Sequence, residues 1–241
     1  MIETLSGVSV VVPLFDEEAN VAPLVAELVA VLGAGELRWE LILVDDGSRD
    51  ETRKRVLEAV ERNRQVRLVP LARNLGQSAA LLAGVRAARL SHVATLDGDL
   101  QNDPADLPRL LEQAARFDVV IGRRARRRAP LARRIAGRLA NAARRAVLRD
   151  GASDTGCSLK VFPVTAFLEL PHFDGMHRFL PALFASHGFS LLELDVNHRP
   201  RRAGRSKYGN LARLRRTAVD LLGVWWLERR AIRLEIDDLL R

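Results

Sequence analysis

The chain of 241 residues is long enough for one α/β domain, or for one domain with an appended arm. Its 48% hydrophobic and 28% charged residues support a buried core and exclude an intrinsically disordered chain. The formal net charge of +8 indicates an anionic partner, and the single cysteine, Cys157, excludes an internal disulfide and is typical of a reducing compartment.

The first half of the sequence alternates short apolar runs with helical segments. Strands are expected at 8–13, 39–44, 66–70, 92–96 and 118–122, and helices at 21–32, 51–63, 77–89 and 104–116. Runs this short and this apolar are typical of strands buried on both faces of a parallel sheet. The alternation therefore predicts a doubly wound, Rossmann-like, mostly parallel sheet, whose ligands bind beyond the carboxyl ends of the strands.

The second half of the sequence is basic. Residues 1–122 hold 13 basic against 19 acidic residues, a net of −6, and residues 123–241 hold 25 against 11, a net of +14. The segment 123–149 contains 11 arginines and no acid, around an apolar stripe of helical spacing formed by Leu131, Ile135 and Leu139. A helix with an apolar stripe and basic flanks is typical of binding to an anionic membrane surface.

The last part of the chain predicts a helix near 179–187, a strand at 190–198, and one or two amphipathic helices in an arm at 209–241. Trp225 and Trp226 lie in this arm, as interfacial anchors or as core residues. Its longest charge-free stretch, 221–227, is far shorter than the ~20 residues that cross a bilayer, so no transmembrane helix is expected. Residues 1–6 do not have the pattern of a signal peptide, so the predicted location is the cytoplasm.

A cluster of carboxylates follows the fourth predicted strand. Asp97 and Asp99 are separated by one glycine, and Gln101 offers a neutral oxygen two residues later. In a tight turn, such oxygens converge on a hard cation such as Mg²⁺ or Mn²⁺. A solvent-facing acidic turn explains the same residues when they are taken alone. Three further polar clusters after the other strands favour the metal site.

These other clusters follow the first, second and third strands. They are Pro-Leu-Phe-Asp-Glu-Glu-Ala-Asn at 13–20, Asp-Asp-Gly-Ser at 45–48 and Arg-Asn-Leu-Gly at 73–76. Ser48 is expected to cap the helix that follows it. Asp45 and Asp46 repel each other unless something binds them, and the ribose or base of a nucleotide would do so at this place in a Rossmann-like sheet.

Taken in order, these motifs resemble those of family 2 glycosyltransferases with the GT-A fold. The likeness rests on Asp16-Glu17 after the first strand, on 45–48, on 73–76, and on Asp-Gly-Asp-Leu-Gln-Asn-Asp-Pro at 97–104. Three later segments, 154–160, 177–179 and 199–208, resemble polyprenyl-phosphate sugar synthases of the dolichyl-phosphate mannosyltransferase kind. The likeness runs from about residue 8 to 208, so a catalytic domain is expected at 5–208.

The resemblance implies roles for the matching positions. The base and ribose of a sugar nucleotide would be held by Pro13, Phe15, Glu17, Asp45 and Asp46, and its diphosphate would lie at Asp97. The metal would be faced by Asp97, Asp99 and Gln101. The phosphates of the acceptor or donor would be faced by Arg123, Arg199, Arg202, Ser206 and Lys207. Asp97, Asp99 and Arg202 would be the catalytic residues. Two positions depart from the family pattern. Asp16 replaces the usual Asn, and Cys157 replaces an aromatic residue, which bears on the shape of the acceptor pocket.

The resemblance implies a single inverting displacement by a hexosyltransferase. A sugar would pass from GDP-mannose or a UDP-sugar to a polyprenyl phosphate, such as dolichyl or undecaprenyl phosphate, while a metal ion neutralises the departing diphosphate. The acceptor is already anionic, so it needs Arg and Lys side chains more than a general base. A lipid acceptor implies a protein peripheral on the cytoplasmic face of a membrane, held by an anionic surface or by a membrane-embedded partner.

Three other functions compete with this one. A family 2 transferase acting on a saccharide hydroxyl in cell-envelope polysaccharide synthesis would need a catalytic carboxylate, for which Asp154 is the best candidate, and the Arg-rich segment 199–207 counts against it. A nucleic-acid-binding protein would use the basic charge, but aromatic residues make up only 5% of the chain and no recognition motif accompanies the arginines, so no nucleic-acid partner is expected. A nucleotidyltransferase would need a Gly-rich loop after the first strand.

Overall fold

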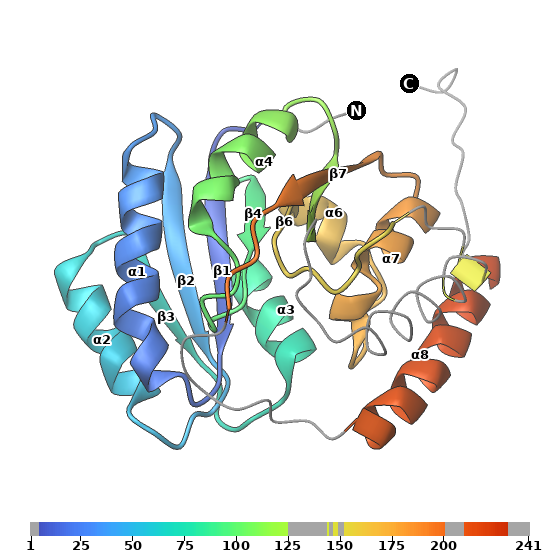
Figure 1. Ribbon diagram of the computed structural model, residues 1–241, viewed down its shortest axis with the longest axis horizontal. Coiled ribbons are helices and arrows are strands. Elements are labelled where there is room, and N and C mark those ends of the chain that lie inside the picture. The colour runs from blue at the N-terminus through green and yellow to red at the C-terminus, as the bar shows by residue number, and fades with distance from the viewer. Residues whose placement is uncertain (1–4, 125–143, 145–146, 149–151, 201–209, 231–241) are drawn as a thin grey trace, which may run out of the picture.

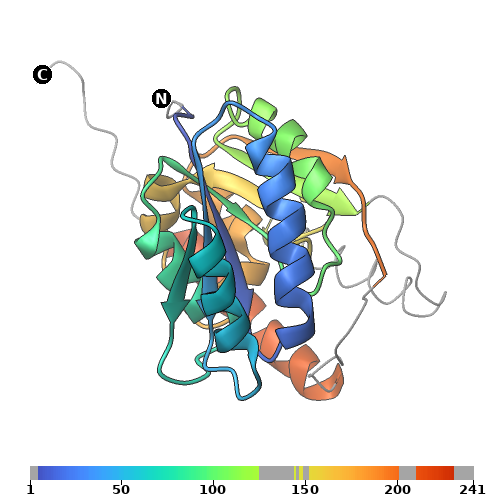
Figure 2. The ribbon, with the colours of Figure 1, turned by 90° about the vertical axis from the view of Figure 1, so that its left-hand side faces the viewer.

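The computed structural model of the protein describes residues 5–124, 144, 147–148, 152–200 and 210–230, with the backbone alone for 210–218. These residues form a seven-stranded sheet with the strand order β3-β2-β1-β4-β6-β5-β7, and helices cover both of its faces (Figure 1, Figure 2). The doubly wound, mostly parallel α/β sheet that the sequence predicts is confirmed.

Four parallel strands form one half of the sheet. They are β1 (Val8–Leu14), β2 (Trp39–Asp45), β3 (Val66–Pro70) and β4 (His92–Thr95), connected in order by α1 (Glu18–Gly33), α2 (Thr52–Arg62) and α3 (Gln77–Ala87). Successive side chains of β1 point to opposite faces. Val10 and Val12 pack in the core with α1 and α2, and Val11 packs in the core with α3. β1, β2 and β4 are buried on both faces, as their apolar runs predicted, whereas β3, at the edge of the sheet, is only partly buried.

The other half of the sheet contains a strand that the sequence analysis did not predict. β5 (Val119–Arg124) and β7 (Leu191–Val196) are parallel, and β6 (Lys160–Pro163) lies between β4 and β5 and runs antiparallel to both. β6 has only four residues, begins with a buried lysine and ends with a proline, so it lacks the pattern by which strands are recognised. The short helix α6 (Val164–Leu168), which follows at once, was not predicted either.

Helices on the two faces complete the three layers. The turn η1 (Pro104–Asp106) and α4 (Leu107–Gln113) lie on the face of α1. The turn η2 (Met176–Arg178), α7 (Leu180–Ser186) and α8 (Asn210–Arg230) lie with α3 and α6 on the other face, where Val224 of α8 is buried in the core. Within the described ranges, no helix combines the length and apolar character that crossing a bilayer requires.

Candidate active site

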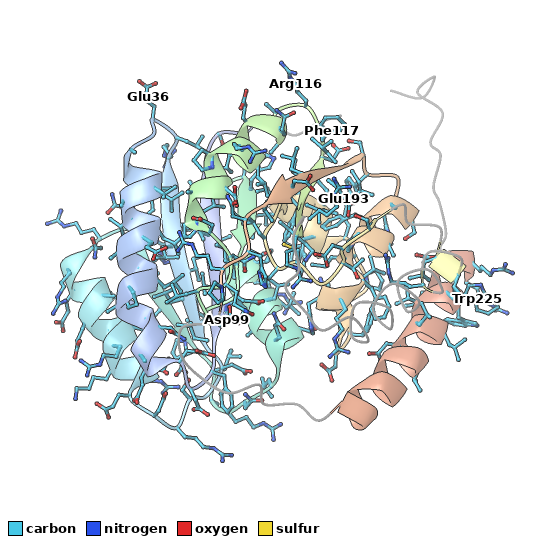
Figure 3. The ribbon with its side chains drawn as sticks, in the orientation of Figure 1. Glu36, Asp99, Arg116, Phe117, Glu193 and Trp225 are labelled. Atoms are coloured by element: carbon cyan, nitrogen blue, oxygen red, sulfur yellow. The ribbon has the colours of Figure 1, made fainter. Side chains whose placement is uncertain are left out.

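The loop after β4 places the predicted metal-binding side chains on a tight turn. Asp99 is buried there, close to the carboxyl ends of the parallel strands (Figure 3). Leu100 has a φ of +61°, a left-handed conformation that costs a non-glycine residue about 1–2 kcal/mol. Its side chain is 2% exposed and packs in the core with α1 and α4. Burial of Leu100 therefore stabilises the turn that carries Asp99 and Gln101.

Asp97 and Asp99 form a close pair of carboxylates. Asp97 Oδ1 accepts a hydrogen bond from Gln77 Nε2 at 2.8 Å, and Asp99 Oδ1 accepts one from the Gln101 N–H at 3.1 Å. Burial and the negative charge of Asp99 raise the pKa of Asp97, although the hydroxyl of Ser158 offsets part of the rise. A bound cation would stabilise two carboxylates that oppose each other in this way.

A pocket opens beside Asp97, between the end of β4, the start of β6, the first turn of α3 and the turn η2. Its lining includes Pro13, Gln77, Asp97, Lys160, His177 and Arg178. Because β6 is antiparallel, its first residue, Lys160, pairs with Thr95 at the end of β4. The unpredicted strand thus brings Lys160 to the edge of the sheet where the predicted metal-binding turn lies.

Lys160 is a buried lysine side chain in the wall of this pocket. Its side chain is 3% exposed, and Nζ donates a hydrogen bond to the carbonyl oxygen of Cys157. Burial lowers the pKa of Lys160, and the nearby acidic groups, Asp97 and Asp154 among them, oppose that shift. A buried charge needs compensation, so the lysine and Asp97 stabilise each other.

Asp154, the candidate base for a hydroxyl acceptor, is held by an arginine. Arg124 Nε and Nη2 donate to its two carboxylate oxygens, both at 2.7 Å, in the two-pronged geometry that suits a guanidinium. The backbone N–H of Arg124 adds a third hydrogen bond at 3.2 Å. Both oxygens of the Asp154 carboxylate are thus bound by Arg124, which counts against its use as a general base.

The adjacent carboxylates after β2 are compensated within the protein. Asp45 accepts hydrogen bonds from the Ser48 N–H at 2.9 Å and from Arg53 Nε at 2.6 Å. Asp46 accepts the N–H groups of Leu75 at 2.7 Å and of Gly76 at 2.9 Å. The inference that their adjacency requires a ligand was wrong, because Asp46 instead ties the loop after β3 to the loop after β2. Their contact with a nucleotide stays a prediction.

The end of β1 and the loop after it hold the other predicted nucleotide-binding residues. Pro13 lines the pocket, Phe15 is half-buried, and Glu17 Oε2 accepts a hydrogen bond from Asn20 Nδ2 at 2.6 Å. Asp16 has a φ of +49°, and its Oδ1 accepts the Arg49 N–H at 2.8 Å. Asn and Asp both tolerate this conformation and both accept such a bond. The departure from the family pattern at Asp16 therefore preserves the local structure.

The two predicted phosphate-binding residues that the structure describes, Arg123 and Arg199, do not line the pocket. Arg123 lies at the exposed end of β5 and pairs with Asp195 at 2.6 Å. Arg199 pairs with Glu27 at 2.5 Å and with Asp103 at 2.6 Å, and its N–H donates to the carbonyl oxygen of Gln101. Arg199 thus braces the loop that follows the metal-binding turn. Arg202, Ser206 and Lys207 lie outside the described residues.

Cys157, where the family pattern has an aromatic residue, is a buried part of the pocket lining. Burial raises the pKa of its thiol, which makes the thiolate scarce and the side chain inert. A Cβ on Gly122 would lie 3.0 Å from its sulfur, so β5 packs tightly behind it. A small side chain here leaves space in the wall of the pocket beside Lys160.

Several pocket residues were not assigned a role from the sequence. Lys160, His177 and Arg178 lie in segments that the resemblance singled out, but no role could be carried to them. Gln77 begins α3 directly behind the Arg-Asn-Leu-Gly loop, and a polar residue at a helix start beside a strand end is the signal that would have found it. The burial of Lys160 has no such signal in the sequence.

The chain is similar to known proteins along most of its length. Residues 9–170 match the model of glycosyl transferase family 2. The dodecaprenyl-phosphate galacturonate synthase of Rhizobium johnstonii is 40% identical over 227 residues, which cover 92% of this chain and 67% of that protein. The undecaprenyl-phosphate 4-deoxy-4-formamido-L-arabinose transferase of Pectobacterium carotovorum is 36% identical over 213 residues, 88% of this chain and 65% of that protein. The chain thus spans about two thirds of the length of these relatives.

Solved structures share the fold. The glucosyl-3-phosphoglycerate synthase of Mycobacterium tuberculosis, in complex with Mg²⁺ and uridine diphosphate, has a TM-score of 0.69 at 19% identity, covering 95% of this chain and 81% of its own. The same enzyme with Mn²⁺, uridine diphosphate and glucosyl-3-phosphoglycerate has a TM-score of 0.66 at 19% identity, covering 95% and 82%. This similarity confirms the GT-A fold that the motifs implied.

Proposed function

The chain belongs to glycosyl transferase family 2, and from this premise we propose that it is an inverting hexosyltransferase that moves a sugar from a nucleotide-diphosphate sugar to a polyprenyl phosphate. Its relatives are named for polyprenyl-phosphate acceptors and for two different sugars, galacturonate and 4-deoxy-4-formamido-L-arabinose. They do not single out mannose. The observation that carries the proposal is the pocket in which Asp97, Lys160 and Arg178 line one space.

The residues after β4 suit a divalent metal. Asp97 and Asp99 are close enough for one to raise the pKa of the other, and Gln101 follows on the same turn. No group of three or more His, Cys, Asp or Glu side chains suited to a metal occurs among the described residues. Mg²⁺ is commonly held by one or two carboxylates together with substrate phosphates, so this donor set fits Mg²⁺ or Mn²⁺ bound with the sugar nucleotide. When bound, the metal neutralises charge on the departing diphosphate.

The cations of the pocket suit an acceptor that is itself an anion. A lipid phosphate needs its charge balanced as it approaches the donor, and Lys160 and Arg178 line the pocket beside Asp97. It does not need a general base to become a nucleophile. A saccharide hydroxyl does, and the candidate base, Asp154, is held by Arg124. The structure therefore favours the phosphate acceptor over the hydroxyl acceptor.

Replacing Arg202 or Lys207 by alanine is expected to impair transfer to undecaprenyl phosphate about 10²-fold while leaving the binding of the sugar nucleotide nearly unchanged, because their charges would serve the acceptor. Transfer is measured with a panel of UDP- and GDP-sugars, and donor binding by calorimetry. Arg116→Ala is the matched control, since Figure 3 shows Arg116 at the top edge of the molecule, away from Asp99. An equal loss of donor binding would move both residues to the nucleotide side and contradict the acceptor role.

We also propose that the protein is peripheral on the cytoplasmic face of a membrane. Val219, Leu222 and Trp226 are 68%, 64% and 52% exposed, and their spacing places them on one side of α8. Trp225 packs against the core instead. Arg230 lies over the ring of Trp226 at 5.3 Å. An apolar stripe that ends in Arg and Trp matches the boundary between anionic headgroups and acyl chains.

The protein is expected to sediment with anionic liposomes at low salt and to be released at high salt, because each basic residue near the surface contributes about 1 kcal/mol and salt screens it. Replacing Leu222 and Trp226 by serine should weaken sedimentation at low salt. Leu57→Ser is the control, since Leu57 is an exposed apolar residue on α2, away from α8. If the wild type does not sediment with anionic liposomes at low salt, direct lipid binding is contradicted, and a membrane-embedded partner would have to hold the protein at the bilayer.

A further inference from the structure

An ion pair links α8 to the wall of the candidate active site. Arg178, the last residue of η2, lines the pocket beside Asp97. Its Nη1 lies 3.5 Å from Oδ2 of Asp220 on α8, and the two side chains are 26% and 14% exposed. Asp220 is not itself among the residues that line the pocket. A cation of the pocket therefore has its carboxylate partner on a helix outside it.

The turn that carries Arg178 is held tightly between α8 and α3. Gly175, just before η2, has a φ of +96°, and a Cβ there would lie 2.8 Å from Oδ2 of Asp220. On the other side, Ser78 Oγ accepts the Gly175 N–H at 3.1 Å and lies 2.7 Å from Nδ1 of His177, in a hydrogen bond. The position of Arg178 thus depends on how α8 sits against the turn.

Arg178 has the chemistry to bind a phosphate. A guanidinium carries five N–H donors in a fixed fork, so one arginine can hold a carboxylate on one side and a phosphate on another. The metal-binding carboxylates lie on the β4 side of the pocket, where the diphosphate of the donor would bind. Arg178 comes from η2, on a different wall. A phosphate that reached Arg178 would therefore lie across the pocket from the metal-binding turn.

We propose that Arg178 binds the phosphate of the acceptor, and that Asp220 is a positioning residue that holds the Arg178 guanidinium in place. The proposal rests on the proposed function, because it assigns the acceptor side of the same site. It gives α8 two faces with different tasks. The outer face carries the apolar stripe of Val219, Leu222 and Trp226, and the inner face sets a cation of the pocket. Binding of the outer face of α8 to a membrane would then hold Arg178 in the position in which it receives a lipid phosphate.

The test separates acceptor binding from catalysis and from folding. Asp220→Asn keeps the shape of the side chain and removes its charge, so it is expected to raise the KM for undecaprenyl phosphate about tenfold, with kcat and the donor Kd changed less than about twofold. Asp220→Glu should restore most of the loss. Arg178→Gln should raise the same KM, and the double variant should add little to it, because the two residues act as one unit. Thermal unfolding checks that each variant is folded.

Glu228→Gln is the matched control, because Glu228 is a half-buried carboxylate of α8 that makes no ion pair with Arg178. Its KM should equal that of the wild type. If the effects of Asp220→Asn and Arg178→Gln multiply, or if the donor Kd rises as much as the acceptor KM, the positioning role is overturned. Arg178→Lys keeps the positive charge but loses the fork of N–H donors, so it tests phosphate binding by Arg178 without altering α8. A wild type that transfers sugar to no polyprenyl phosphate overturns the proposed function as well, whereas wild-type transfer with an unchanged KM in Asp220→Asn overturns this proposal alone.

Discussion

Replacing Asp99 by asparagine is expected to lower the rate of sugar transfer by about 10²-fold or more, because a metal at the departing diphosphate contributes several kcal/mol to the transition state. Asparagine keeps an oxygen that can accept the Gln101 N–H, so the turn should survive while the charge is lost. Transfer of a radiolabelled sugar to undecaprenyl phosphate, at saturating Mg²⁺ or Mn²⁺, measures the loss. Chelator should abolish wild-type activity, and either metal should restore it.

Asp118→Asn is the control for this substitution. Asp118 also accepts a backbone N–H, from Ser190 at 2.8 Å, but it lies just before the amino end of β5, away from the metal-binding turn. Its activity should stay within about twofold of the wild type, because it takes no part in the site. Full activity of the wild type in excess chelator, or of Asp99→Asn, would rule out the metal site.

Gly47→Ala is expected to destabilise the protein by about 2–5 kcal/mol, through two costs that add. Gly47 has a φ of +68°, which costs alanine about 1–2 kcal/mol. A Cβ would also lie 2.5 Å from the carbonyl carbon of Arg73 and 2.6 Å from the backbone nitrogen of Asn74, and such overpacking costs about 1–3 kcal/mol. Moving this backbone disturbs the loop that Asp46 holds. Urea unfolding measures the loss of stability, and calorimetry should show weaker binding of the sugar nucleotide.

Gly33→Ala is the matched control, because nothing lies within 4 Å of a Cβ at Gly33, near the end of α1. Alanine should leave stability unchanged or raise it by about 0.4–1 kcal/mol, since it restricts the unfolded chain without strain. Equal midpoints of urea unfolding for Gly47→Ala and the wild type would contradict this prediction, because they would show that the loops after β2 and β3 accommodate the added Cβ without loss of stability.

The parallel half of the fold could be predicted because the local sequence pattern of its strands reflects their burial. A strand buried on both faces must be mostly apolar, as β1 and β2 are, and polar residues lie at the carboxyl end of each, at the edge where ligands bind. β6 could not be predicted in this way, because it begins with a lysine and ends with a proline. Lys160 is stable in a buried strand because the carbonyl oxygen of Cys157 and nearby acidic groups compensate its charge, and no local pattern records Asp97, which lies far away in the sequence.

The residue types of the candidate site could be predicted from the sequence, but the directions in which their side chains point could not. Arg123 and Arg124 are neighbours on β5, so their side chains point to opposite sides, and the sequence does not say which one faces inward. Arg124 binds Asp154, while Arg123 is exposed. The contact between Arg178 and Asp220 joins a turn to a helix far along the chain. Such pairs depend on tertiary packing, which propensity and motif order do not determine.

The antiparallel strand β6 also has a consequence for the order in which the chain folds. β6 must insert between β4 and β5 and pairs with β4, which lies far earlier in the chain, and contacts between segments far apart form slowly. Until it does, β4 presents an unpaired edge to which another chain can add. During synthesis the first half emerges before β6 exists. Insertion of β6 closes that edge and, in the same event, brings Lys160 to the pocket, so a chain in which Lys160 lines the pocket is also one in which β4 can no longer pair with another chain.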